Sequence, residues 1–219
     1  MLRQALVAEG LGSLLLAATV IGSGIMAERL AGGNLAVALL ANTAATVAVL
    51  ATLIALLGPV SGAHFNPAVS VIETLRGRLT LPRAIAYIVV QIGGCCLGAL
   101  LAHAMFEMPL IQTSQHLRSG PAQWLSEGVA TAGLILVVMG SSTSNEAAWR
   151  VGAWIGAAYW FTASTSFANP AITIARSLSN TFAGIAPIHV AGFIASQLCG
   201  AVVGFLLAKF LLSTGSSLR

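Results

Sequence analysis

The sequence predicts an all-α membrane protein in which six transmembrane helices and two half-helices form an inverted repeat. Three observations predict this class. Of the 219 residues, 57% are hydrophobic and only 7% are charged, whereas a soluble domain carries about a quarter charged residues. The charged residues are clustered, so long apolar stretches lie between them. The triplet Asn-Pro-Ala occurs twice, at matching places in two halves of the chain that resemble each other.

Six apolar stretches are long enough, or nearly so, to cross a hydrocarbon core of about 30 Å. They are Ala5–Met26, Asn34–Leu57, Pro82–Phe106, Trp124–Gly140, Ala147–Thr162 and Ile188–Leu212, of which the fifth is marginal at its polar end. The first stretch also has features of a cleaved signal peptide. However, Glu9 interrupts it and the internal repeat includes it, so a retained helix is favoured.

The basic residues follow the pattern of membrane topology. With a cytoplasmic N-terminus and six crossings, Arg3, Arg76, Arg78, Arg83, Arg150, Lys209 and Arg219 lie inside, and Arg29, Arg118 and Arg176 lie outside. This distribution obeys the positive-inside rule, which the opposite orientation would violate. Both termini are therefore predicted to be cytoplasmic. The net charge of +4 reflects this topology and is no sign of nucleic-acid binding.

The two halves of the chain repeat one arrangement of helices. The corresponding segments are Ala8–Val20 with Ser126–Val138, and Val89–His103 with Ala195–Lys209. Glu9 and Glu127 precede glycine in the first pair, and Gln91 and Gln197 lie in the second. Three crossings per half is an odd number, so the second half must be inverted. We expect one domain over residues 1–219, with repeats at about 1–108 and 120–215.

Each Asn-Pro-Ala triplet marks the start of a short helix. The triplets are Asn66-Pro67-Ala68 and Asn169-Pro170-Ala171, in which asparagine caps the helix and proline fits its first position. From Asn66 to Arg76 a helix would be roughly 16 Å long, about half the bilayer core. Two such helices would meet head to head near the midplane, where their dipoles repel cations. The asparagine amides would remain free to donate hydrogen bonds into a lumen.

The segments AHFNPAVS and SFANPAIT, the two Glu-Gly helix starts and the two glutamine-containing helices resemble the aquaporin, or major intrinsic protein, family. The resemblance covers nearly the whole chain and implies the aquaporin fold. It also implies a homotetramer in which each subunit has its own pore. In the family an arginine directly follows the second motif and lines the narrowest constriction. Here Ile172 occupies that place.

Related sequences place the other constriction residues at Thr46, Ala157 and Ser166. Together with Ile172 these would form a wide opening without a fixed charge, suited to solutes larger than water. The resemblance therefore implies an aquaglyceroporin-like channel for water, glycerol and urea. By analogy with bacterial channels that lack the arginine, it extends to arsenous acid and other neutral metalloid hydroxides. Arg176, one turn after Ile172, either reaches the lumen or pairs with carbonyls or the interface, and the second interpretation is favoured.

Several other polar residues have two interpretations each. Glu9 and Glu127 either couple protons or accept backbone N–H groups of the half-helix loops, and their symmetric placement favours the structural role. Gln91 and Gln197 are expected to bridge either the half-helices or the neighbouring helices. His64 either packs against the loop or lines the pore as a donor and pH-dependent gate.

Three other function classes remain as alternatives. A secondary transporter with proton-coupled uptake would also use an inverted repeat with broken helices. A purely structural membrane protein is disfavoured by the short loops and the open constriction that the sequence predicts. An enzyme is disfavoured because the chain has no Asp and no recognisable nucleophile–base pair. The three cysteines lack the spacing of metal ligands, so neither a metal nor a cofactor is expected. Lipid and small neutral solutes are the expected partners, and the short termini favour a bacterial inner membrane.

Overall fold

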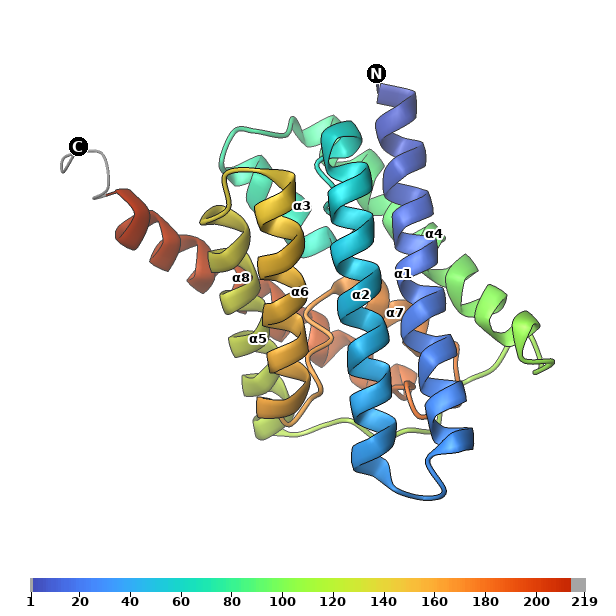
Figure 1. The fold of residues 1–219 in the computed structure, drawn as a ribbon. Coiled ribbons are helices and arrows are strands. Elements are labelled where there is room, and N and C mark those ends of the chain that lie inside the picture. The colour runs from blue at the N-terminus through green and yellow to red at the C-terminus, as the bar shows by residue number, and fades with distance from the viewer. Residues whose placement is uncertain (1, 214–219) are drawn as a thin grey trace.

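The computed structural model describes residues 2–213, and these residues contain helices but no strand (Figure 1). Arg219, counted above among the inside residues, lies outside this range. The helices are α1 (Leu2–Leu30), α2 (Leu35–Ser61), α3 (Pro67–Leu75), α4 (Leu81–Met105), α5 (Pro121–Met139), α6 (Ser144–Phe161), α7 (Pro170–Arg176) and α8 (Pro187–Ser213). The predicted fold class is confirmed: six long helices accompany two short ones that follow the Asn-Pro motifs.

Helix length separates the spanning helices from the two short ones. Within the described residues, α1, α2, α4, α5 and α8 are long and apolar enough to cross a membrane. Helix α6 has 18 residues and carries Glu146 and Arg150 near its start, which explains why its apolar stretch is marginal. Helices α3 and α7 have nine and seven residues. They are therefore about 14 and 10 Å long, too short to cross alone.

The two short helices occupy opposite halves of the bundle. Figure 1 shows α3 in the upper part of the view and α7 below it, close to mid-height. The start of α1, the end of α8 and the α5–α6 connection lie toward the α3 side, and the α1–α2 connection lies on the α7 side. We call these sides the α3 end and the α7 end. Each half-helix thus enters the bundle from its own end.

Small residues bring two helix pairs into backbone contact. A Cβ at Gly98 of α4 would lie 2.2 Å from the Leu14 carbonyl oxygen of α1, and one at Gly204 of α8 would lie 2.3 Å from the Ala132 carbonyl of α5. Only glycine fits there, as is usual between membrane helices. A Cβ at Gly93, which also looks like an interface residue in the sequence, would meet nothing within 4 Å.

The outer face of the bundle is apolar. Leu40, Ile85 and Leu206 are each more than half exposed, although all three are large hydrophobic residues. Their exposure is favourable where the surrounding solvent is hydrocarbon. The polar residues Glu9, Glu127, Gln91 and Gln197 are instead fully buried. This inside-out distribution is that of a membrane protein, and it directs attention to the interior.

Candidate functional site

A cavity of about 290 Å³ runs through the interior and is lined by residues of both halves of the chain. At the α3 end it reaches Glu73, Arg76 and Arg78, and toward the α7 end it reaches Arg176. Both motif asparagines line it between these limits. The half-helices therefore flank one continuous space.

Asn66 and Asn169 bond each other's loops across this space. The Asn66 Oδ1 accepts the Ala68 N–H (2.9 Å), while its Nδ2 donates to the Ala168 carbonyl (2.7 Å). Asn169 repeats the arrangement: Oδ1 accepts the Ala171 N–H (3.0 Å) and Nδ2 donates to the Phe65 carbonyl (2.8 Å). The expectation of wholly free amides is corrected, because one hydrogen of each NH2 crosslinks the two loops. One hydrogen of each remains for the cavity.

The loops that precede the asparagines adopt unusual backbone conformations. Ala63 and Phe65 have φ values of 50° and 48°, and Ser166 and Ala168 have values of 49° and 47°. A left-handed conformation costs a non-glycine residue about 1–2 kcal/mol. All four residues also line the cavity. The loops must therefore be held in place by contacts with the rest of the bundle.

Glu9 supplies such contacts to the first loop. Its Oε1 accepts the Ser61 hydroxyl (2.7 Å) and the His64 N–H (2.9 Å), and its Oε2 accepts the Phe65 N–H (2.8 Å). Gln91 donates to the same Oε2 at 2.8 Å and to the Ser70 hydroxyl of α3 at 3.0 Å. Every contact uses Glu9 as an acceptor, which is the role of a carboxylate.

Glu127 and the second loop have the same arrangement. Its two oxygens accept the N–H groups of Phe167 (2.8 Å) and Ala168 (2.9 Å). Gln197 donates to Glu127 at 2.6 Å and to the Thr173 hydroxyl of α7 at 2.8 Å. In both halves, a buried carboxylate and a glutamine therefore connect a loop, a half-helix and two long helices.

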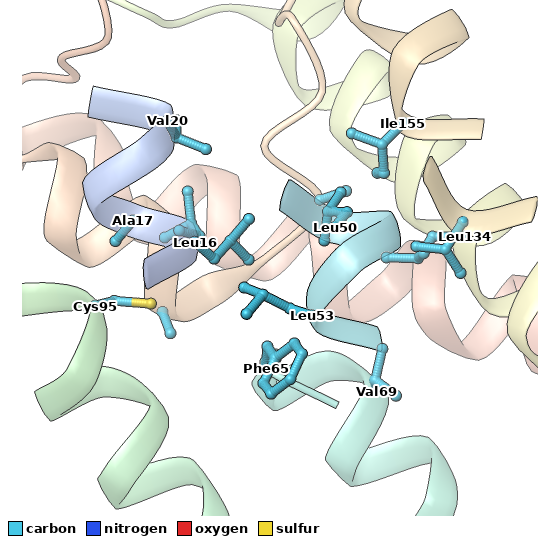
Figure 2. Close-up of a cluster of buried hydrophobic side chains, with 14 of the residues drawn as sticks. Leu16, Ala17, Val20, Leu50, Leu53, Phe65, Val69, Cys95, Leu134 and Ile155 are labelled. Atoms are coloured by element: carbon cyan, nitrogen blue, oxygen red, sulfur yellow. The ribbon is translucent and has the colours of Figure 1, made fainter. Parts of the chain in front are cut away.

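One side of the cavity is apolar. Figure 2 shows part of the buried cluster that forms it, and the cluster residues that line the cavity include Leu16, Val20, Leu50, Val69, Leu134 and Ile155. These side chains come from α1, α2, α3, α5 and α6. They offer no hydrogen bonds, so a polar solute in the cavity has to find its partners on the other lining residues.

Three of the four expected constriction residues line the cavity, namely Thr46, Ser166 and Ile172. The prediction for Ala157 is wrong: this residue is exposed on the outside of α6. The cavity is instead lined by Ile155 and Tyr159, which are four residues apart on one face of the helix. Ala157 lies midway between them in sequence and so faces the other way. The Tyr159 hydroxyl lies 3.3 Å from the Thr46 hydroxyl.

Arg176 is buried in the cavity wall and is 2% exposed. Its Nε donates to the Ala183 carbonyl, and its Cζ lies 3.4 Å from the centre of the Phe167 ring. Arg176 therefore pairs with a carbonyl, as the favoured interpretation expects, and it also lies in the cavity wall. A second guanidinium, for which the sequence carries no motif, lies beside the same ring. Arg118, from the α4–α5 connection, has its Cζ 5.2 Å from the same ring and donates to the Gly184 carbonyl at 2.8 Å.

The α3 end of the cavity has charges of both signs. Arg76 and Glu73 form an ion pair with 2.5 Å between Nη1 and Oε1. His64 lines the cavity nearby, with its Nδ1 3.0 Å from the Ser70 hydroxyl and its ring against the edge of Tyr87. Both interpretations of His64, packing and lining, therefore describe its position.

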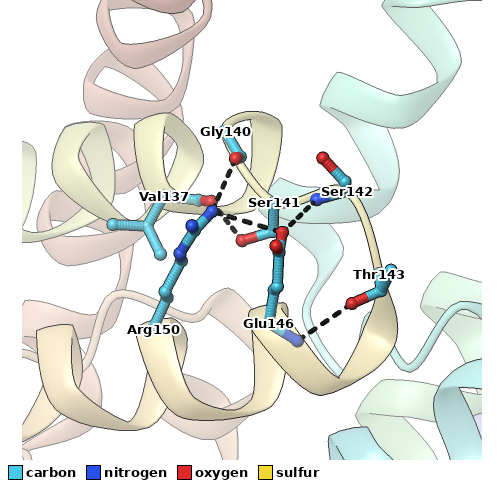
Figure 3. A network of polar contacts seen from close by, with 7 residues as sticks. All are labelled: Val137, Gly140, Ser141, Ser142, Thr143, Glu146 and Arg150. Atoms are coloured by element: carbon cyan, nitrogen blue, oxygen red, sulfur yellow. Dashed lines mark hydrogen bonds and ion pairs between the residues drawn. The ribbon is translucent and has the colours of Figure 1, made fainter.

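The α5–α6 connection completes this end, since Ser141–Ser144 line the cavity. Figure 3 shows how the connection is ordered. Arg150 donates to the Gly140 carbonyl (2.8 Å), and Glu146 accepts the Ser142 N–H (2.8 Å) and lies 3.4 Å from Arg150. A local ion pair thus shapes the rim without placing its charges in the cavity.

The comparisons with known proteins agree with this architecture. The family described as major intrinsic protein matches residues 1–150. The chain is 52% identical to the aquaglyceroporin AqpS of Rhizobium meliloti (strain 1021) over 162 residues, which are 73% of this chain and 70% of the relative. It is 36% identical to the lens fiber major intrinsic protein of Gallus gallus over 41% of this chain and 36% of the relative.

A solved structure shows the same fold at low sequence identity. The aquaglyceroporin from Plasmodium falciparum matches with a TM-score of 0.73 and 18% identity, over all of both chains. The family match, the aquaglyceroporin relative and the similar solved structure all agree with a fold in which a cavity lies between two opposed half-helices. This chain is a member of the major intrinsic protein family.

Proposed function

We propose that this protein is a passive channel for water and small uncharged solutes such as glycerol. The observation that carries the proposal is the cavity that extends from the α3 end past both motif asparagines to Arg176. Its polar side offers donors from the asparagine amides, and its apolar side fits the carbon face of a polyol. The close relative named an aquaglyceroporin supports the same solute class. Members of this family are channels, which separates the chain from enzymes.

The finer assignment of solutes extends this proposal to urea and arsenous acid. It is supported by Ile172, which is 4% exposed and lines the cavity where the family has an arginine. Stopped-flow light scattering on proteoliposomes tests it with water, glycerol, urea and arsenous acid in turn. We expect downhill flux of all four. A channel that passes water alone would contradict the broad-specificity proposal.

The variant Ile172→Arg probes the constriction directly. A longer, charged side chain narrows the space, so we expect glycerol and arsenite flux to fall more than water flux. Ile111→Arg is the matched control, because Ile111 is 81% exposed outside the cavity. If Ile172→Arg lowers the flux of every solute equally, or if Ile111→Arg changes the fluxes in the same way, the assignment of Ile172 to the constriction is wrong.

The alternative function is proton-coupled uptake by a secondary transporter, and it needs an acid that exchanges protons at depth. Glu9 and Glu127 accept four and three hydrogen bonds from the loops and glutamines. These contacts support a structural role. Accumulation of glycerol against its gradient, driven by a pH gradient, would favour the transporter, and simple equilibration favours the channel.

We also propose the assembly and topology that the family resemblance implies: a homotetramer in the bacterial inner membrane with both termini cytoplasmic. The apolar outer face, with residues such as Leu40 and Leu206, supports contacts with lipid and with other subunits. The matching contacts of Glu9 and Glu127 support inverted repeats at about 1–108 and 120–215 within one domain. Native mass spectrometry and accessibility labelling of single cysteines test the mass and the orientation.

A further inference from the structure

The connection that follows α7 lies where the cavity would open at the α7 end. The cavity lining reaches Arg176, the last residue of α7, and includes none of the described residues 177–186. Within that stretch Ser179, Ala183 and Ile185 are fully buried, although they belong to no helix. We call residues 181–183 the cover segment, because they lie between the lined cavity and the α7 end.

The cover segment contacts α1 one helical turn beyond the cavity. Val20 of α1 lines the cavity, and Gly24 follows four residues later, about 6 Å nearer the α7 end. A Cβ at Gly24 would lie 3.4 Å from the Ala183 Cβ and 3.6 Å from Phe182 Cδ1. Where α1 passes beyond the lined cavity, the cover segment therefore packs directly against it.

The cover segment also contacts the wall that α7 forms. The Arg176 Nε donates to the carbonyl of Ala183. Asn42 of α2 borders the same place, because its Nδ2 lies 3.7 Å from the Cβ position of Gly24. Residues of α1, α2 and α7 therefore meet around Ala183, and the cavity is closed at this end in the structure.

The chain is anchored on both sides of the cover segment. Before it, the Ser179 hydroxyl lies 2.9 Å from Nε2 of His103, a fully buried residue of α4. After it, the Ala186 N–H donates to the His116 carbonyl at 2.7 Å. Residues 181–183 can therefore change conformation between two fixed points without moving α7 or α8.

The contacts of Phe182, in the middle of the cover segment, are longer. Its N–H donates to Glu28 Oε2 at 3.3 Å, and its carbonyl accepts from Arg118 at 3.3 Å. The Arg118 bond to the Gly184 carbonyl, on the anchored side, is 2.8 Å long. Glu28 is exposed at the end of α1, so water competes for its carboxylate. Few and weak bonds of this kind are typical of segments that open locally.

We propose that the cover segment is a gate, closed in this structure, which opens the α7 end of the pore when it moves away from α1. Opening separates Ala183 from Gly24 and breaks the bond between Phe182 and Glu28. Only the open state conducts, so a change that weakens the closed state raises flux, and a link that holds it closed abolishes flux. The inference rests on the proposed channel function and adds to it a means of regulating the same pore.

A disulfide between α1 and the cover segment tests the gate. The Cβ positions at Gly24 and Ala183 are 3.4 Å apart, close to the separation of about 3.5–4.5 Å in disulfides. In proteoliposomes, oxidation of the double variant Gly24→Cys/Ala183→Cys should lower water and glycerol flux to the level of protein-free liposomes, and reduction should restore it. The two single variants keep the natural free cysteines and should not respond. Undiminished flux with the disulfide formed, as counted by thiol labelling, overturns the proposal.

A second pair of variants decides the matter if the two cysteines do not join. Glu28→Ala removes the acceptor of the Phe182 N–H, so both fluxes should rise by about two- to tenfold, the effect of one net hydrogen bond on the closed state. Glu28→Gln keeps an acceptor oxygen there and should conduct like the natural protein. The gate is refuted if Glu28→Ala also conducts like the natural protein. If neither the natural protein nor Glu28→Ala conducts, the channel function itself fails; if both conduct and neither locking nor loosening changes flux, only this inference fails.

Discussion

Replacing either buried glutamate by glutamine tests how the pore loops are held. In Glu9→Gln one oxygen that now accepts two hydrogen bonds becomes an NH2 donor. If it replaces Oε1, Ser61 can rotate to accept, but the His64 N–H loses its acceptor. If it replaces Oε2, Gln91 can turn its Oε1, which has no partner within residues 2–213, toward the new NH2, but the Phe65 N–H loses its acceptor. Either orientation leaves one buried backbone N–H unpaired.

The expected magnitude follows from this geometry. One buried unpaired N–H costs about 1–3 kcal/mol, and the remaining bonds change from charged to neutral acceptors, each losing about 1 kcal/mol before the smaller desolvation cost is credited. The net loss of stability is therefore about 2–4 kcal/mol. Glu127→Gln should cost about the same, because any orientation of its amide also leaves the Phe167 or the Ala168 N–H unpaired.

Thermal unfolding of the purified protein in detergent measures the effect. A loss of about 2–4 kcal/mol corresponds to a Tm roughly 4–16 °C lower for a chain of this length. Glu107→Gln is the control, because Glu107 is exposed. Flux of water and glycerol through the folded fraction should be retained at reduced level. The reasoning is refuted if both buried variants unfold like the natural protein, and a loss of pH-driven accumulation in stable variants would indicate proton coupling instead.

Three further predictions concern packing, charge and the corrected constriction. Gly98→Val should lower stability by about 1–3 kcal/mol because its side chain overpacks the α1–α4 contact, whereas Gly93→Val should be tolerated in the same unfolding assay. Asn169→Asp loses its donor and places a negative charge among the cavity residues, so we expect lower glycerol flux and a cation leak in a dye-based liposome assay. Tyr159→Phe should change the glycerol-to-water ratio and Ala157→Ser should not; the reverse result would restore Ala157 to the constriction.

Much of the fold follows from local properties of the chain. Asn169 shows this well: an asparagine before proline caps a helix through contacts two and three residues away, so the start of α7 is evident from the sequence. The limits of the spanning helices are similarly local, because they depend on runs of apolar residues. The loop contacts of Glu9 and Glu127 also agree with the sequence interpretation, since symmetric acids beside irregular loops have few other partners.

The composition of the constriction depends on which way each side chain points. Counting from Asn169 placed Ala157 in the wall, but the path between α6 and α7 gives that position to Tyr159. The Arg176 guanidinium shares the cavity wall with Ile172 although it comes a turn later, and its Nε is directed by the Ala183 carbonyl.

The sequence by itself determined the helices, their approximate ends and the paired half-helix starts, because these arise from hydrophobic length and capping within a few residues. Only the tertiary structure decided that the asparagine amides bond the opposite loops and that the Arg176 guanidinium lies in the cavity wall. Those features join residues far apart in the chain, and their geometry exists only once the helices have packed.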